Sequence, residues 1–368
     1  CRRLGRSAPR PAPTRWLYYT SGTTSEPKGV RHTDASLMAA GRAMAGRMEL
    51  RADDREALVF PVTHIGGLVW LTAGLTSGCR HLVVPAFDPE ASIDFLSREG
   101  VTVAGGGTIF CTHYLARQQR EPDRRIFPSV RLFVSGGAGK PPVLHDELKA
   151  AFGGGGLLSS YGSTEAPIVT HGLVDDVDDK RRTTEGLPCP GVSMVTKGPA
   201  GEHLPRGQEG ELCIKAPQMF QGYLDPTLDA AAFDDEGFFR TGDLAVIDGD
   251  GYVAITGRLK EIVIRKGENI STKEIEDLLH RHPRVADVAV IGLPDREAGE
   301  RCCAVVTLVD PDRPLELAEM VEYLKALDLM VQKIPEQLEV VDELPRNITG
   351  KVLKQRLRER FAAAAAVE

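Results

Sequence analysis

The pattern of apolar and polar residues changes twice along the chain. From Trp16 onward, short aliphatic runs such as LVVPAF, VRLFVSGG and GLLSSYG alternate with amphipathic stretches such as SIDFLSREG and VLHDELKAAF. This alternation predicts strands joined by crossover helices in a layered α/β domain. Between about residues 185 and 257 the apolar runs are shorter and are broken by Gly, Pro and Asp, as in GELCIKAP. Such spacing predicts antiparallel β structure.

From Arg258 the pattern changes again. The segments EIVIRKG, ADVAVIGLPD and CCAVVTLVD predict strands, and TKEIEDLLHRHP, ELAEMVEYLKAL and the basic KVLKQRLRERF predict helices. An α+β unit of this size can fold by itself. We therefore expect a disordered or truncated leader at residues 1–15, a partial large domain at 16–257 and a small C-terminal domain at 258–368. Residues 57–75 lack charge but contain proline, histidine and glycines, so we interpret them as buried core rather than a membrane span.

Composition excludes several classes of function. The formal net charge of -7 argues against a general nucleic-acid binder, although it leaves small anionic ligands open. The seven cysteines are scattered and form no CxxC pair, so neither a disulfide framework nor a zinc site is indicated. A reducing cytoplasm fits this usage best. The sequence predicts no oligomeric state.

The most informative local segment is TSGTTSEPKGV at residues 20–30, which follows the apolar WLYY. A hydroxyl- and glycine-rich turn after a strand presents N–H and O–H donors to a polyanion, and a lysine adds positive charge. The order Lys28-Gly29-Val30 differs from a Walker A loop, in which Ser or Thr follows the lysine. The alternative is a solvated loop. The candidate phosphate-binding residues are Thr20, Ser21, Gly22, Thr23, Thr24 and Lys28.

Two acidic motifs follow. In Tyr161-Gly162-Ser163-Thr164-Glu165 the aromatic ring can stack on a purine, and the hydroxyl and carboxylate oxygens suit Mg²⁺. In FRTGDL at residues 239–244, Asp243 follows a glycine turn and can bind vicinal ribose hydroxyls. Read alone, the first segment can be an ordinary turn and the second an ordinary hairpin.

Two basic segments follow towards the C-terminus. Arg258 and Lys260 flank the predicted domain junction, where they can bind phosphate or hold one domain orientation. Lys351 lies on a glycine turn before a helix, and a loop lysine can neutralise charge that grows in a transition state. Read alone, the first segment is more often a solvated linker and the second an exposed surface lysine.

An apolar segment around His64 is a candidate wall of a substrate pocket. A hydrogen-bonded core histidine is an equal alternative at this position. The full set of pocket candidates is His64, Trp70, Gly136, Gly137, Ala138 and Ile168.

Taken in order, the segments TSGTTSEPKGV, YGSTE, GELCIKAP, FRTGDL, GRLKEIVIRKGENIS and PRNITGK resemble the adenylate-forming superfamily of acyl-CoA synthetases, luciferases and peptide-synthetase adenylation domains. The resemblance runs from Trp16 to about Phe361. It implies a large α/β domain with a distorted β-barrel-like subdomain, and a mobile α+β C-terminal domain. It also implies ATP, Mg²⁺ and coenzyme A as cofactor and co-substrates, and a small carboxylic acid as substrate.

The resemblance implies a role for each motif. The loop from Gly22 to Lys28 would hold the β- and γ-phosphates, and Tyr161 would stack on adenine. Thr164 and Glu165 would serve phosphate and Mg²⁺. Asp243 would bind the ribose with Arg258 close by, and Gly137, Gly162 and Gly267 would contact the nucleotide. Lys260 would be the hinge between the domains. Lys351 would contact the carboxylate and the α-phosphate.

Within the superfamily, GENISTKEIEDLLHRHP and VADVAVIGLPDREAGE look like the acyl-CoA ligase branch, with a fatty or alicyclic acid as substrate. Two alternatives are an acyl-AMP ligase that loads a separate carrier protein and an inactive truncated nucleotide-binding homologue. Ser25 stands where glycine is commoner. Only about fifteen residues precede the phosphate loop, whereas the family has a long N-terminal portion there. We expect a fragment, a second chain that supplies this portion, or an impaired protein, with an apolar face exposed.

Overall fold

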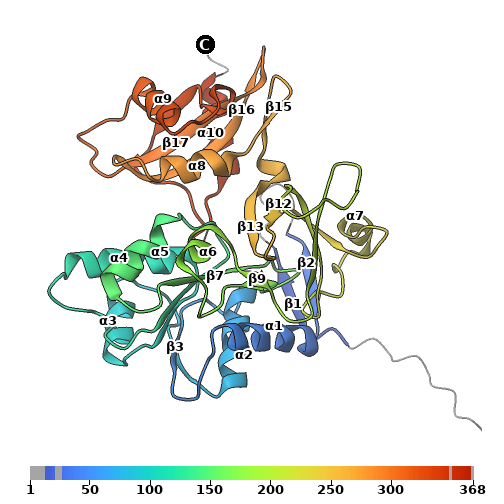
Figure 1. Ribbon diagram of the computed structural model, residues 1–368, viewed down its shortest axis with the longest axis vertical. Helices are drawn as coiled ribbons and strands as arrows, with labels where there is room; N and C mark the ends of the chain where they lie inside the picture. Colours follow the sequence, from blue (N-terminus) through green and yellow to red (C-terminus); the bar gives the residue numbers. More distant parts are fainter. Residues whose placement is uncertain (1–12, 21–26, 348–349, 366–368) are drawn as a thin grey trace, which may run out of the picture.

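The computed structural model describes residues 13–20, 27–347 and 350–365, with side chains described as far as residue 362. Figure 1 shows a small C-terminal domain, in orange and red, above a larger α/β part. This arrangement matches the predicted fold class of a large layered α/β domain and a small α+β domain. No helix in the described ranges has the length and apolar character needed to cross a bilayer.

The chain enters the fold through an antiparallel hairpin of β1 (Trp16–Tyr19) and β2 (Gly29–His32). Tyr18 anchors the hairpin, because its buried ring joins a small apolar cluster and its hydroxyl donates to the carbonyl of Val62 at 2.9 Å. Helix α1 (Asp34–Arg47) follows, with Thr33 as N-cap in a capping box. The other three residues of β1, Trp16, Leu17 and Tyr19, are exposed, at 39%, 43% and 59%.

A seven-stranded sheet in the order β4-β3-β5-β6-β7-β8-β9 forms the centre of the large domain. The strands β4, β3, β5, β6 and β7 pair in parallel. Strand β8 pairs antiparallel with β7, and β9 pairs antiparallel with β8. The strands are β3 (Arg55–Leu58), β4 (Arg80–Val83), β5 (Val103–Gly105), β6 (Leu132–Ser135), β7 (Leu157–Tyr161), β8 (Thr170–His171) and β9 (Leu187–Pro188). The helices are α2 (Ile65–Ser77), α3 (Ala91–Arg98), α4 (Thr108–Arg120), α5 (Val143–Phe152) and α6 (Asp178–Thr183).

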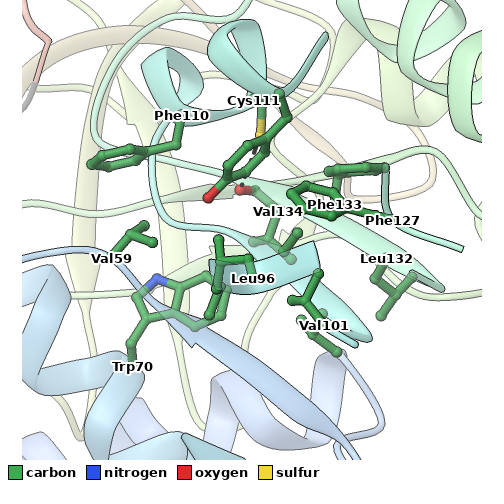
Figure 2. Packing of buried hydrophobic residues seen from close by; sticks show 14 of the residues in the cluster. Val59, Trp70, Leu96, Val101, Phe110, Cys111, Phe127, Leu132, Phe133 and Val134 are labelled. Carbon is green, nitrogen blue, oxygen red and sulfur yellow. Dashed lines mark hydrogen bonds between the residues drawn. The ribbon is translucent and has the colours of Figure 1, made fainter. Parts of the chain in front are cut away.

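The core of this domain lies between the parallel strands and their crossover helices. Figure 2 shows Trp70, Phe110, Phe127, Phe133 and the strand residue Val134 among the buried side chains of this core. The strands β5, β6 and β7 end in glycine-rich or hydroxyl-rich loops on the same edge of the sheet. Ligands of open α/β sheets bind at that carboxyl edge.

The antiparallel region predicted from residue 185 onward is a four-stranded sheet in the order β10-β11-β12-β13. Register shifts interrupt the pairing of β11 with β12 and of β12 with β13. The strands are β10 (Ser193–Lys197), β11 (Gly210–Lys215), β12 (Phe239–Ile247) and β13 (Val253–Arg258), and the short helix α7 (Asp229–Ala232) lies between β11 and β12. This sheet is the antiparallel β structure that the spacing between about residues 185 and 257 predicted.

The C-terminal domain has a sheet in the order β15-β14-β17-β16, with β18 beside β17. Helix α8 ends at Leu279, so His280 and His282 follow the helix instead of extending it. The elements are β14 (Val263–Arg265), β15 (Glu268–Ile270), α8 (Thr272–Leu279), β16 (Val285–Asp295), β17 (Gly299–Leu308), α9 (Leu317–Ala326), β18 (Gln337–Val340) and α10 (Lys354–Ala365). Its two apolar clusters lie on opposite faces of the sheet, which makes the domain a separate packing unit.

Candidate active site

The hydroxyl-rich loop connects the two strands of the β1–β2 hairpin. Its base is closed by a hydrogen bond from the N–H of Thr20 to the carbonyl of Lys28, at 3.0 Å. The Thr20 hydroxyl accepts from the N–H of Lys28 at 3.4 Å. Both residues line one large cleft. The predicted contacts at Ser21, Gly22, Thr23 and Thr24 lie outside the described residues.

The motif after β7 folds into a tight turn. A Cβ atom on Gly162 would lie 2.4 Å from the backbone nitrogen of Ile168, so the turn requires glycine at that position. The Nε2 atom of His32 is 2.7 Å from the carbonyl oxygen of Thr164. Burial lowers the pKa of His32, which favours the neutral ring as the donor. The hairpin and the turn are therefore joined by a partly buried hydrogen bond.

Glu165 and Lys28 meet around the ring of Tyr223. The Tyr223 hydroxyl donates to Oε1 of Glu165 at 2.9 Å. The Lys28 ammonium lies 5.1 Å from the centre of the same ring, within the range of a cation–π interaction. One tyrosine thus holds a cation from the hairpin and a carboxylate from the turn on the same side of the cleft.

Asp243 is the centre of a second polar cluster. Its side chain is buried, accepts from the Tyr161 hydroxyl at 2.6 Å and pairs with Nε of Arg258 at 2.7 Å. The register of β12 and β13 places Asp243 opposite Arg258. Burial, and then the Asp243 charge, raise the pKa of the Tyr161 hydroxyl, so that it remains a donor. Tyr161 and Arg258 therefore fix both carboxylate oxygens of Asp243.

Lys351 reaches the cleft from the C-terminal domain. Two hydrogen bonds join it to Asn347: the N–H of Asn347 donates to the Lys351 carbonyl and the Lys351 N–H donates to Oδ1 of Asn347, both at 3.0 Å. Burial, and then the positive charge of Arg258, lower the pKa of the Lys351 ammonium from 10.5 to about 8. A lysine with a lowered pKa inside a cleft is a candidate functional group.

The cleft between the two domains has a volume of about 1100 Å³. Fourteen of the predicted site residues line it: Thr20, Lys28, His64, Trp70, Gly136, Gly137, Gly162, Thr164, Glu165, Ile168, Asp243, Arg258, Lys260 and Lys351. Segments that are far apart in the sequence therefore meet in one space, as the combined motifs predicted. Their individual roles remain predictions.

Three predicted residues do not line the cleft. Tyr161 reaches it only through the Asp243 carboxylate. The carbonyl of Ala138 accepts from the Thr108 hydroxyl at 3.4 Å, which turns this residue towards α4. Gly267 lies in the exposed turn between β14 and β15, with φ of 85°. In this domain orientation Gly267 is outside the cleft, so its predicted nucleotide contact is not made here.

His64 combines the two interpretations left open by the sequence. Its Nδ1 accepts from the N–H of Gly66 at 3.0 Å and caps helix α2, and its ring stacks on Phe60 with centres 5.2 Å apart. Because Nδ1 is an acceptor and burial lowers the pKa of the ring, His64 is neutral. It also lines the cleft, next to Val69 and Trp70 of α2.

Sequence reasoning missed three residues that organise this site. Tyr223 and His32 hold Glu165 and Thr164, over separations of 58 and 132 residues. Lys354 pairs with Glu261 at 2.8 Å and with Glu276 at 2.9 Å, and so ties the start of α10 to the predicted hinge and to α8. These residues lie outside the motifs quoted above. Only Lys354 had a local signal, because it belongs to the basic run after Lys351.

The fold and the site together define a class of two-domain α/β proteins in which a small domain inserts a lysine into a cleft lined by hydroxyl and acidic groups. Comparison with known families agrees with this class. Residues 5–224 match the model of the AMP-binding enzyme family, and residues 274–351 match that of the AMP-binding enzyme C-terminal domain. The chain belongs to the AMP-binding enzyme family, which confirms the resemblance read from the motifs.

Its relatives include several named ligases. The chain is 36% identical to the medium-chain fatty-acid–CoA ligase of Escherichia coli, over 93% of this chain and 60% of that protein. It is 33% identical to the indoleacetate–CoA ligase of Aromatoleum aromaticum, over 96% of this chain and 68% of that protein. The chain thus spans less than two thirds of the length of the Escherichia coli relative.

Among solved structures, ATP-bound MatB from Rhodopseudomonas palustris is similar over 95% of this chain and 68% of its own, with 34% identity and a TM-score of 0.87. The apo form of the same protein gives a TM-score of 0.73 over the same shares of the two chains. The present structure is therefore more similar to the ATP-bound form than to the apo form.

Proposed function

We propose that this chain catalyses the ATP-dependent formation of an acyl-CoA. A carboxylate attacks the α-phosphorus of ATP to give acyl-AMP and pyrophosphate, and the thiol of coenzyme A then displaces AMP. The observation that carries the proposal is the convergence of Lys28, Glu165, Asp243 and Lys351 on one cleft. The names of the relatives, which are CoA ligases, support the same reaction.

The first half-reaction needs a site for the polyphosphate and a positive charge to offset the negative charge on the pentavalent phosphorus centre of the transition state. Lys28 and the loop that it closes would bind the outer phosphates, and Asp243 would accept hydrogen bonds from the ribose. Lys351 would place its ammonium between the carboxylate and the α-phosphate, where charge develops. The greater similarity to ATP-bound MatB supports this domain orientation as the one used for adenylation.

The metal would arrive with the nucleotide. Thr164 and Glu165 offer a hydroxyl and a carboxylate, which are hard oxygen ligands, and Mg²⁺ usually keeps waters and substrate phosphates as its other ligands. These two residues fit a MgATP substrate. The ion would offset negative charge on the leaving pyrophosphate.

The second half-reaction would need Lys351 to leave the cleft. We propose a rotation at Lys260 that removes the lysine and brings another face of the C-terminal domain to the acyl-adenylate. Gly267, exposed in the β14–β15 turn, lies on that domain and would move with it. A hinge at an exposed residue just after β13 can absorb such a change in backbone angles.

The acyl group would be uncharged. The described cleft residues between Phe60 and Gly106 are apolar, hydroxyl-bearing or glycine, together with the neutral His64. No lysine or arginine of this stretch lines the cleft to pair with a second carboxylate. We therefore propose a fatty or alicyclic monocarboxylic acid, since burial of an unpaired second charge is costly.

The test is carboxylate-dependent release of pyrophosphate from ATP, with a panel of fatty, alicyclic, aromatic and dicarboxylic acids. We expect release with apolar monocarboxylic acids and a thioester only when coenzyme A is present. A holo carrier protein competes as the acceptor in a parallel arm, and preference for it would redirect the second half-reaction. Absence of release from a folded sample with every acid would refute the proposal for this chain.

A further inference from the structure

The loop that carries Lys351 approaches helix α4 of the large domain, where Gly350 lies against Ile109. A Cβ atom built on Gly350 would lie 2.7 Å from Cβ and 2.8 Å from Cγ2 of Ile109. Distances this short mean that the backbone of Gly350 already packs directly on Ile109. The φ angle of Gly350 is 82°, a conformation that side chains other than glycine rarely adopt.

We propose that Ile109 is a positioning residue for adenylation, the surface against which the Gly350 backbone stops so that Lys351 is held in the cleft. The proposal rests on the function given above. Ile109 is not among the residues that line the cleft, so it would act through Gly350 of the other domain. Lys351 is the next residue after Gly350, only about 3.8 Å further along the chain.

Ile109 is held in place by the large domain. It belongs to the first turn of α4, and its side chain packs against the apolar core of the large domain. Its carbonyl accepts from the Thr112 hydroxyl at 2.8 Å, and the preceding Thr108 bonds to the segment after β6. Because this part of α4 is fixed to the sheet, contact with Ile109 defines the depth to which the loop can enter.

Gly350 is also held by hydrogen bonds within its own domain. The N–H of Gly350 donates to the Asn347 carbonyl at 2.9 Å, and the Arg346 guanidinium donates to the Gly350 carbonyl. The N–H of Leu353 donates to the Pro345 carbonyl at 2.7 Å. These bonds tie Gly350 to Arg346 and Asn347, and Lys351 is the next residue in the chain, so displacement at Gly350 also displaces Lys351.

The test compares the two half-reactions in Ile109 variants. We expect Ile109→Trp to lower carboxylate-dependent ATP–pyrophosphate exchange by about 100-fold, because a shift of about 1 Å at a catalytic group can cost that much. Ile109→Ala should lower it by roughly tenfold, since the support recedes but nothing blocks the loop. Thioester formation from supplied acyl-adenylate and coenzyme A should stay within about threefold of the parent, because Lys351 has left the cleft in that step.

Ala116→Trp is the matched control, since it adds the same side chain at an exposed position of the same helix. It should leave both half-reactions unchanged. Equal losses in both half-reactions for Ile109→Trp, or full exchange activity in both Ile109 variants, would overturn the proposal.

Trypsin cleavage after Lys351, followed by mass spectrometry, gives a readout that needs no catalysis. Ile109→Trp should be cut at Lys351 several-fold faster than the parent and the Ala116→Trp control, because the loop no longer docks. If the parent shows no exchange but this difference is present, the proposed function fails while the docking contact stands. Identical cleavage rates in all three proteins would refute the contact.

Discussion

The adenylation half-reaction should lose activity as the pH rises through about 8, because Lys351 must be protonated to offset phosphate charge. Burial in the cleft and the nearby Arg258 lower the pKa of this ammonium from 10.5 to about 8. Both effects disfavour the charged form, and the carboxylates of Glu261 and Asp243 only partly oppose them. The charged, active form is therefore present below that pH and is lost above it.

The size of the effect follows from the two pKa values. At pH 9 about one tenth of a group with a pKa of about 8 is protonated, compared with about 97% of a lysine at 10.5. The value of kcat/KM reports the free enzyme. We therefore expect kcat/KM for ATP to fall about eightfold between pH 7.5 and 9, and by a further factor of about ten for each later pH unit.

The assay is ATP–pyrophosphate exchange without coenzyme A, so that titration of the thiol plays no part. Lys351→Arg supplies the control, since a guanidinium keeps its charge throughout this range. Its residual exchange should not fall above pH 8. A parent enzyme whose kcat/KM stays level to pH 9.5, or a Lys351→Arg variant that falls with the same slope, would refute the assignment of the titration to Lys351.

Three further predictions follow from single contacts. Lys351→Ala should reduce adenylation by more than about 100-fold while thioester formation from supplied acyl-adenylate is largely retained, and similar losses in both half-reactions would contradict the division of roles. Tyr161→Phe keeps the ring but loses the hydroxyl bond to Asp243, so KM for ATP should rise about fivefold, the equivalent of about 1 kcal/mol, and Tyr161→Ala should raise it much further if the ring binds adenine. Burial raises the carboxyl pKa of Glu56, which lies between Cys79 and His81, from 4.5 to about 8. The folded state then holds this proton more tightly, so stability should fall as the pH rises from about 4.5 to about 8, by at most about 1.4 kcal/mol per pH unit. Urea titrations at both ends of this window should show that Glu56→Gln removes that dependence.

The sequence predicted the fold and the residues that line the cleft, but not the contacts that hold these residues in place. Strand and helix periodicity indicated the layered domain, the antiparallel region and the C-terminal unit, because each pattern is local. The site motifs were found for a similar reason, since each combines a glycine with polar groups within a few residues. The Tyr161 motif follows β7, whereas Gly242 and Asp243 lie inside β12 and Lys351 precedes α10. The turn at Gly162 shows this, because the close approach of Ile168 permits no other residue.

The contacts that hold those groups in place had no comparable signal. The bond from Tyr223 to Glu165 and that from His32 to Thr164 join segments whose separation depends on the whole topology. Ile109 is one of many aliphatic residues on amphipathic helices, and only the packing of two domains distinguishes it. A pattern of residue types encodes which face of an element is buried, but not which residue of another domain meets it.

Lys351 shows why a motif alone is insufficient. Read as a segment, a lysine on a glycine turn is most often an exposed residue whose ammonium stays charged to high pH. Here the same turn packs on α4 and faces Arg258, and those two surroundings together lower its pKa into the range where a proton can be lost. The chemical character of this lysine is therefore a property of the domain interface, and changes at that interface, at Ile109 or Arg258, should alter its titration without any change to the motif itself.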